Sequence, residues 1–253
     1  MRFRITVKGT PLLAFLKEMP FFLRTYHEIK RQARESREEF PFGDFYPCLE
    51  YRHKESGEAS GHYFHQDLLV ASMVFNNKPE RHVDVGSSMN FVAHVASFRE
   101  VEVFDIRGQR SLFENIRFRR LDLMEEGFDL VDYCDSVSCL HVLEHLGLGR
   151  YGDRVDYEGH LKGWKNIHTM LRKGGKFYFS APIGPQRIEF NAHRVFSLRY
   201  LLCLMEGRYR VDSFSYVDDE GDLVRDADLS SADAVGKNFN CHYGCGIFEL
   251  TKA

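Results

Sequence analysis

The residues with the clearest chemical purpose lie in the stretch 81–90, where a short apolar run ends in Asp84-Val-Gly86 and continues as Ser87-Ser88. A glycine at the end of a strand can adopt a backbone conformation closed to other residues. A helix that follows such a turn directs its free N–H groups and the positive end of its dipole toward the turn. We therefore expect this turn to hold a nucleotide-like cofactor that carries an anionic group.

Two further carboxylates follow neighbouring runs of strand character. The run 101–105 ends in Asp105, which stands 21 positions after Asp84. That is the spacing at which a carboxylate on the second strand accepts hydrogen bonds from a ribose diol. Asp122 follows a third run and could meet the amino group of an adenine, although taken alone it favours a helix N-cap or a solvated turn.

A cluster of ionisable side chains, His141, Glu144 and His145, follows the fourth strand-like run. The spacing formally matches the H-x-x-E-H pattern of a zinc protease family. Three glycines follow within the next seven residues, and they exclude the uninterrupted helix that this zinc site needs. A histidine here could act as a proton acceptor, or all three residues could only orient the chain by hydrogen bonds.

The segment 147–153 reads Gly-Leu-Gly-Arg150-Tyr151-Gly-Asp153 and is too rich in glycine for a helix. Such a loop suits an active-site lid, although it could be only the turn that leads to the next helix. The segment Cys241-His-Tyr-Gly-Cys245 has the spacing of metal ligands, but no second pair of ligands stands nearby, so two buried thiols are expected.

These residues must be positioned by alternating strands and helices. An α/β fold with a parallel sheet and helices on both faces follows from this alternation. Two later strand-like runs, 209–217 and 246–251, are expected to pair as an antiparallel hairpin. We expect helices near 63–77, 89–98 and 158–172, and strands near 82–85, 101–105, 116–120, 134–139 and 175–180. Glycines 174 and 175 are expected to cap the helix before the last of these strands.

Proline and glycine punctuate residues 38–61, which predicts a linker; an N-terminal helical segment and this linker (1–60) therefore precede the main domain (61–253). Residues 1–37 hold nine Lys and Arg against three Glu, among apolar side chains. Such a segment could lie on the anionic inner face of a membrane, as a peripheral contact, but packing as helices that cap the main domain is favoured.

Composition limits the classes of function. A formal charge of −3 gives no basic footprint, so long nucleic acid is not expected as a partner. Six cysteines are too sparse for a disulfide scaffold, and no apolar run has the length of a membrane span, so a reducing, cytoplasmic location is expected.

Between residues 61 and 251 the sequence resembles class I S-adenosylmethionine-dependent methyltransferases. The resemblance rests on the order of the motifs Asp84-x-Gly86, Asp105, Asp122, Glu144-His145 and Arg172-Lys-Gly-Gly175. It implies a Rossmann-like, seven-stranded, mostly parallel sheet of order 3-2-1-4-5-7-6. The segments 62–67, 147–153 and 190–194 also resemble a narrower family of unknown function, often associated with bacterial surface polysaccharide genes.

The resemblance implies roles for the turn and its neighbours. Gly86, with Asp84, Ser87 and Ser88, would contact the methionine part of S-adenosylmethionine, Asp105 the ribose and Asp122 the adenine side. One departure from the pattern is Ser88, which replaces the usual second glycine and should narrow the pocket. Tyr63 and Gln66, with Asp67, fall at one end of a predicted helix and would cover the methionine carboxylate or only form surface hydrogen bonds.

The expected reaction is methyl transfer to a small polar acceptor, with a sugar or glycan precursor suggested by the narrower resemblance. His145 or His141 would be the base, or Glu144 and these histidines would bind a divalent ion with His193. The residues expected to contact the acceptor are Arg150, Tyr151, Asp153, Asn191, His193 and Arg194. Two rival functions are a non-catalytic protein that binds a membrane or partner and, less favoured because the turn lacks G-x-G-x-x-G, a nicotinamide-dependent oxidoreductase.

Overall fold

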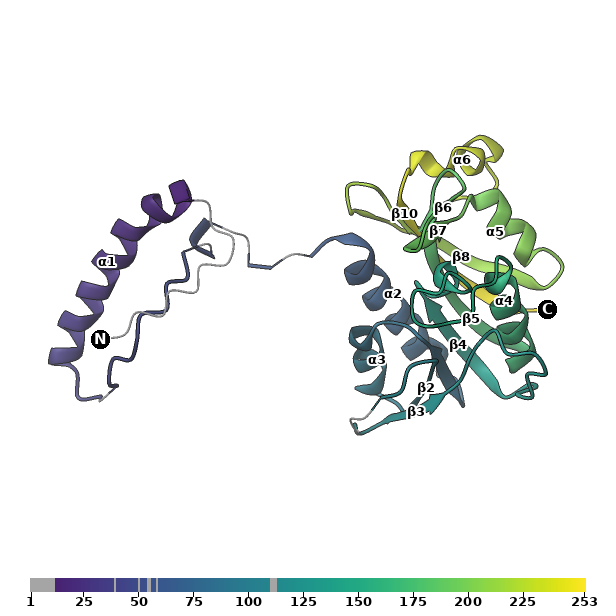
Figure 1. Cartoon of the computed structure of the whole chain (residues 1–253), viewed down its shortest axis with the longest axis horizontal. Helices are drawn as coiled ribbons and strands as arrows, with labels where there is room; N and C mark the ends of the chain where they lie inside the picture. Colours follow the sequence, from purple (N-terminus) through teal and green to yellow (C-terminus); the bar gives the residue numbers. More distant parts are fainter. Residues whose placement is uncertain (1–11, 39, 50, 54–55, 58, 110–112) are drawn as a thin grey trace. The chain divides into compact units, whose positions relative to one another are not determined.

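The computed structural model describes residues 12–38, 40–49, 51–53, 56–57, 59–109 and 113–253 (Figure 1). The chain divides into two compact units, Met1–Glu58 and Ala59–Ala253. The strands predicted from the sequence, and the candidate site residues at their ends, all belong to the second unit.

The first unit contains the helix α1 (Leu12–Glu35), which has Pro20 inside it, and the short 3-10 helix η1 (Tyr51–His53). The ring of Tyr26 on α1 packs against Phe42 and Phe45, with centroid distances of 5.9 and 4.6 Å. The segment after α1 thus folds back along it and covers part of its apolar surface. Among the described residues, no helix combines the length and the apolar character needed to cross a membrane.

In the second unit α2, β1, α3 and β2 alternate; β2, β3 and β4 then follow one another with no helix among the described residues, and η2 and α4 separate β4 from β5. The strands are β1 (His82–Val85), β2 (Val101–Asp105), β3 (Ile116–Arg120), β4 (Cys134–Leu140), β5 (Leu171–Ile183), β6 (Arg187–Glu189), β7 (His193–Val195), β8 (Tyr209–Val217), β9 (Leu223–Val224) and β10 (Gly244–Lys252). The helices are α2 (Gly61–Asn77), α3 (Met89–Ala96), η2 (Leu143–His145), α4 (Gly159–Met170), α5 (Leu198–Met205), α6 (Ala232–Gly236) and η3 (Asn238–Asn240).

The main sheet has the order β3-β2-β1-β4-β5-β10-β8-β9. Strands β1 to β5 pair in parallel, and β10 lies antiparallel between β5 and β8. The predicted order 3-2-1-4-5-7-6 is therefore correct when β10 counts as the seventh strand and β8 as the sixth. The eighth strand, β9, is an addition of two residues that pairs with β8. The predicted antiparallel pairing of the last two long strands is confirmed.

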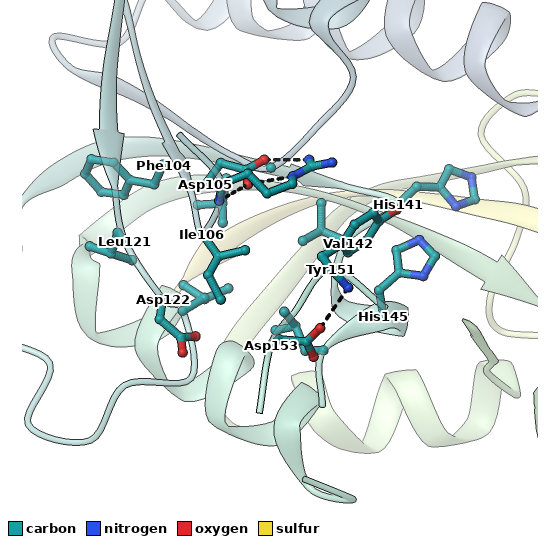
Figure 2. Close-up of a pocket in the computed structure, with 15 residues that line it drawn as sticks. Phe104, Asp105, Ile106, Leu121, Asp122, His141, Val142, His145, Tyr151 and Asp153 are labelled. Atoms are coloured by element: carbon teal, nitrogen blue, oxygen red, sulfur yellow. Dashed lines mark hydrogen bonds and ion pairs between the residues drawn. The ribbon is translucent and has the colours of Figure 1, made fainter. Parts of the chain in front are cut away.

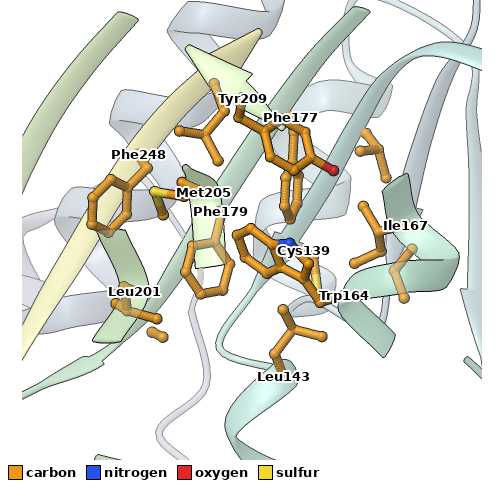
Figure 3. Close-up of a cluster of buried hydrophobic side chains, with 14 of the residues drawn as sticks. Cys139, Leu143, Trp164, Ile167, Phe177, Phe179, Leu201, Met205, Tyr209 and Phe248 are labelled. Carbon is orange, nitrogen blue, oxygen red and sulfur yellow. The ribbon is translucent and has the colours of Figure 1, made fainter. Parts of the chain in front are cut away.

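Helices cover both faces of this sheet, and each face has its own apolar core. Side chains alternate along β5, so Phe177 and Phe179 belong to the core under α4 and α5, whereas Tyr178 belongs to the core under α2 and α3. Trp164 of α4 packs edge-on against both phenylalanine rings at 5.4 and 5.3 Å (Figure 3). The sheet is thus fixed as a rigid support whose strand ends can carry chemistry.

The prediction that glycines 174 and 175 cap a helix is wrong. Strand β5 begins at Leu171, directly after α4, and both glycines lie inside it. Gly174 has φ +76°, and the register between β4 and β5 shifts at this point. A side chain on Gly175 would meet the Asp135 backbone oxygen at 3.0 Å. The glycines therefore form an irregularity in the strand where its backbone approaches β4 closely.

Candidate functional site

The cleft of this fold opens where β1 and β4 lie side by side and the order of the strands reverses, which is where open α/β sheets bind ligands. The turn after β1 carries Gly86, whose φ is +64° and whose backbone N–H donates to the Phe104 carbonyl oxygen at 2.9 Å. A Cβ at this glycine would lie 3.3 Å from the Val142 side chain. Because Gly86 has no side chain, the backbone of the turn can lie close to Val142 and stays uncovered on the side of the cleft.

One half of the cleft, the strand-end compartment, lies between the carboxyl ends of β1, β2 and β3 and the loop after β4 (Figure 2). It encloses about 590 Å³ of space, part of which is open to solvent. Its lining residues are Val85, Gly86, Phe104, Asp105, Ile106, Arg107, Leu121, Asp122, Leu123, His141, Val142, His145, Leu146, Tyr151 and Asp153. Apolar side chains form much of this wall and carboxylates stand at its rim, as a flat ring joined to a polar sugar would require.

Asp105 and Asp122 both line the strand-end compartment, where the ends of β2 and β3 place them. The Asp105 carboxylate accepts hydrogen bonds from Nε and Nη2 of Arg107 at 2.9 and 2.7 Å, and the guanidinium lies 4.6 Å from the Tyr151 ring. A ribose diol would have to share this carboxylate with Arg107. One oxygen of Asp122 accepts from the Met124 backbone N–H at 2.8 Å, which is the turn-forming role considered for it.

Asp84 lies behind the turn and not in the cleft, because its side chain has no exposed surface. Its two oxygens accept hydrogen bonds from Ser138 Oγ at 2.6 Å and from the Ser87 backbone N–H at 3.1 Å. Burial raises the pKa of this carboxyl to about 6, although the hydrogen bonds oppose the shift. The direct cofactor contact expected for Asp84 is thus replaced by a supporting role beneath the turn.

Ser88 has a structural reason to replace glycine. Its hydroxyl caps α3 by accepting from the Phe91 backbone N–H at 3.1 Å and donates to Asp67 at 2.9 Å. Ser87 fixes the other side of the turn, where its hydroxyl accepts from the Leu140 backbone N–H. Both serines also line the second half of the cleft.

The second half of the cleft, the histidine compartment, adjoins the first and shares five residues with it, Gly86, Arg107, His141, His145 and Tyr151. Its other lining residues are His62, Tyr63, Ser87, Ser88, Met89, Leu140, Glu144, Arg150, Ala192, His193 and Tyr243. Polar and aromatic side chains dominate this wall, in contrast to the apolar strand-end compartment.

His145 stands where the two compartments meet. Its Nδ1 lies 2.7 Å from the Ala192 carbonyl oxygen, which can only accept, so Nδ1 carries the proton and Nε2 presents a lone pair. Burial lowers the pKa of this imidazole, which keeps the ring neutral near pH 7. The side chain is therefore in the form that can accept a proton.

His141 and Glu144 form a buried pair next to His145. The Nδ1 atom of His141 lies 2.7 Å from Oε1 of Glu144, and their side chains are 5% and 1% exposed. Burial alone would lower the pKa of His141, but its interactions with Cys245 and Glu144 outweigh it and raise the pKa well above its usual value. The backbone of His141 has φ +54°, a conformation that non-glycine residues rarely adopt.

Asp153 organises the loop predicted as a lid. One carboxylate oxygen accepts from the backbone N–H groups of Gly147 and Gly149 at 2.8 and 3.2 Å, and the other accepts from that of Tyr151 at 3.1 Å. The loop thereby presents Tyr151 and Arg150 to the histidine compartment. Asp153 lines the cleft, but its three bonds are within the loop.

Besides Asp84, the predicted contact residues Gln66 and Arg194 do not line the cleft. Gln66 has no exposed surface and accepts a hydrogen bond from Ser180 at 2.6 Å, on the buried side of α2. Arg194 is 4% exposed and donates to three backbone carbonyls, those of residues 144, 146 and 157. Arg194 therefore fixes the segment of Glu144 from behind, whereas Tyr63 lines the histidine compartment.

The predicted metal set of His141, Glu144, His145 and His193 is not brought together as one group. His193 lines the histidine compartment, but its Nε2 faces Glu189 at 3.1 Å, across the ribbon of β6 and β7. Asn191 lies exposed in the turn of that ribbon, outside both sets of lining residues.

The structure adds His62, Arg107 and Tyr243 to the cleft, and sequence reasoning assigned none of them. His62 stacks on His141 with ring centroids 5.4 Å apart and planes at 4°, and Tyr243 lies 5.4 Å from His62. Tyr243 belongs to the segment Cys241-His-Tyr-Gly-Cys245, so that segment was a signal for the site. Its two cysteines are buried and unbridged, as expected.

Residues 106–240, more than half of the chain, match the family model described as "Caenorhabditis protein of unknown function, DUF268". The chain belongs to this family. The match begins at the end of β2 and includes the loop that follows β4, the ribbon of β6 and β7, and α5. No protein with a curated description matches the sequence.

The fold is that of class I methyltransferases. One similar solved structure is Burkholderia thailandensis 1,6-didemethyltoxoflavin-N1-methyltransferase with bound 1,6-didemethyltoxoflavin and S-adenosylhomocysteine, at 12% identity, 98% coverage of this chain, 93% coverage of that chain and a TM-score of 0.52. Another is geranyl diphosphate methyltransferase in complex with S-adenosylmethionine, at 10% identity, 73% and 85% coverage and a TM-score of 0.50. At these identities the likeness concerns the fold.

Proposed function

We propose that this chain is an S-adenosylmethionine-dependent methyltransferase that acts on a small polar acceptor, with His145 as the general base. The observation that carries the proposal is the junction of two compartments at the switch point of the sheet, one suited to a nucleoside and the other to a polar acceptor. His145 stands at that junction with its tautomer fixed by Ala192.

The strand-end compartment fits the nucleoside half of the cofactor. Apolar side chains, among them Phe104, Leu121 and Val142, line a slot for the adenine ring. Asp105 stands at the end of β2, where a carboxylate can accept from a ribose diol. Gly86 and the N-terminus of α3 offer exposed backbone groups to the methionine part. The two similar solved methyltransferases, which contain bound S-adenosylhomocysteine or S-adenosylmethionine, support this choice of cofactor.

The bound cofactor supplies a methyl group on a sulfonium, and its transfer is a direct displacement that depends chiefly on alignment. The protein's remaining task for a hydroxyl acceptor is removal of a proton. His145 can accept this proton at Nε2 because its Nδ1 is held by Ala192, and buried Glu144, 3.8 Å from Nε2, would favour the resulting positive charge.

The wall of the histidine compartment supports a hydroxyl-rich acceptor such as a sugar or glycan precursor. Tyr63, Tyr151 and Tyr243 provide aromatic surface for the C–H faces of such a molecule. Arg150 provides donors for its oxygens, and Arg150 is held in place by its bond to the Ala192 carbonyl at 2.9 Å. The loop organised by Asp153 borders the compartment and could close over a small acceptor.

Calorimetric titration of the full chain with S-adenosylhomocysteine and, separately, with NAD⁺ tests the class of cofactor. We expect binding of S-adenosylhomocysteine and none of NAD⁺. Binding of NAD⁺ alone would indicate an oxidoreductase, and binding of neither would favour a non-catalytic protein.

The role of His145 is tested by transfer of a tritiated methyl group from S-adenosylmethionine to a panel of sugars and nucleoside-diphosphate sugars. His145→Gln should lower kcat by roughly 100-fold or more and leave binding of the cofactor within about two-fold. His65→Gln, a histidine of α2 that does not line either compartment, serves as the control. Equal rates in the His145 and His65 variants would contradict the assignment.

A further inference from the structure

We propose that His62, His141 and Cys245 form a binding site for a zinc ion at the wall of the histidine compartment. Within the part of the chain that the structure describes, one ligand atom from each of these residues lies within 4.8 Å of the other two. The three residues come from distant parts of the sequence, the start of α2, the end of β4 and β10. The three ligand atoms are two imidazole nitrogens and one sulfur, with no carboxylate oxygen among them.

The orientation of His141 supports a metal ligand. Its Nδ1 is held by Glu144 at 2.7 Å, which leaves Nε2 as the atom that faces the cluster. This Nε2 is buried and has no nitrogen or oxygen partner among the described residues; the neighbouring group that interacts with this imidazole is the Cys245 thiol. A carboxylate that fixes one imidazole nitrogen while the other binds the metal is a common arrangement in zinc sites. An unsatisfied buried nitrogen is otherwise costly.

His62 and Cys245 complete the ligand set. The ring of His62 is hydrogen-bonded to the backbone of Tyr243, and an imidazole that donates through one nitrogen presents a lone pair at the other. The Cys245 thiol is fully buried, and it donates only weak hydrogen bonds, to Gln66 and to the Gly246 carbonyl, both at 3.8 Å. Binding of zinc would release the thiol proton and give the sulfur a far stronger partner.

The chemistry of the three atoms selects the ion. Imidazole nitrogen and thiolate sulfur suit zinc, whereas magnesium and calcium require oxygen ligands. Ligand atoms around a tetrahedral zinc lie roughly 3.3–3.8 Å apart, so the side chains would close by only about 1 Å. Three protein ligands leave a fourth position open, as in catalytic zinc sites. His62 and His141 line the histidine compartment, so the ion would lie at its wall.

The backbone at His141 is consistent with a functional constraint. Its φ of +54° costs on the order of 1–3 kcal/mol, and the surrounding structure holds it through the bond from its N–H to the Ser180 carbonyl at 3.1 Å. This conformation directs the imidazole away from the path of β4 and toward α2 and β10, where the other two ligands stand.

Metal titration of the full-length chain tests the site. Protein stripped by a chelator is titrated with Co²⁺, followed by its absorption spectrum, and with Zn²⁺, followed by metal content after gel filtration. We expect one ion per chain and a thiolate-to-cobalt absorption band in the near ultraviolet. Cys245→Ser should abolish the band and weaken binding by at least about ten-fold. Cys241→Ser, which removes another buried thiol four residues away, should retain both.

His62→Ala tests the same site if Cys245→Ser does not fold. His62 is only half-buried at the start of α2, so its replacement should leave the fold intact. It should weaken cobalt binding by at least about ten-fold, and the control His65→Ala on the same helix should not. Absence of stoichiometric binding, or binding that survives both Cys245→Ser and His62→Ala, would overturn the proposal. Because no methyl donor is present, this result is independent of the proposed methyl transfer.

Discussion

Single residues of the cleft divide into those that face it and those that hold it from behind. Asp105 and Asp122 were predictable as lining residues because a carboxylate that ends a parallel strand lies at the ligand-binding edge of the sheet. Gln66 and Arg194 were not, because the sequence does not reveal which side of a helix or ribbon is buried. The proximity of His62 to Cys245 was also out of reach, since it depends on how the start of α2 lies against β10, which the sequence does not reveal.

The buried carboxyl of Asp84 should make stability depend on pH. Its pKa is about 6 in the folded chain, above the usual 3.8, so its stabilising contribution is full below about pH 4 and is lost as pH rises through 6. The free energy of unfolding of the wild type, relative to Asp84→Asn, should fall by roughly 2–3 kcal/mol between pH 4 and pH 7. Urea unfolding of both proteins at several pH values measures it, and parallel pH profiles would refute it.

The strands β1, β2 and β3 have the bounds predicted from the sequence, because each run is short, contains β-branched or aromatic residues and is followed by a turn. The ribbon of β6 and β7 and the helix α5 were not predicted. The ribbon strands have three residues each, too few for a pattern of alternation to emerge. The glycine-rich loop 147–153 was identified as an element, but its internal bonds to Asp153 were visible only in the structure.

That loop yields a prediction about two of its glycines. A Cβ at Gly147, where φ is +77°, would lie 1.9 Å from the Asp156 carbonyl oxygen, whereas a Cβ at Gly152, where φ is +81°, meets open space. We expect Gly147→Ala to lower the free energy of unfolding by about 3 kcal/mol or more and Gly152→Ala by about 1 kcal/mol. Chemical denaturation compares them, and equal losses would mean that the close contact at Gly147 is unimportant.

At the scale of the whole molecule, the doubly wound architecture and its strand order were predictable from the resemblance together with the alternation of strands and helices. The compartments that this architecture creates consist of residues from the unit Ala59–Ala253. The contact of the basic first unit with a membrane or a partner stays a prediction.

A fragment of residues 59–253 should therefore fold and bind without the first unit. We expect its Tm to lie within about 3 °C of the corresponding transition of the full chain, a difference below about 1 kcal/mol in stability. Its affinity for S-adenosylhomocysteine should agree within about two-fold. Differential scanning calorimetry and titration calorimetry provide the two values; a fragment that folds but binds at least ten-fold more weakly would show that the cleft is incomplete without residues 1–58.

The central claim, that the strand-end compartment receives the nucleoside of S-adenosylmethionine at Asp105, is tested most directly by titrating S-adenosylhomocysteine into two variants of strand β2 and its flank. Asp105→Asn should weaken binding by roughly ten-fold or more, because a charged acceptor for the ribose diol is lost. Glu100→Gln alters an exposed carboxylate at the opposite end of the strand, paired with Arg117, and should leave the affinity within about two-fold. Tight binding that Asp105→Asn does not weaken would contradict the claim.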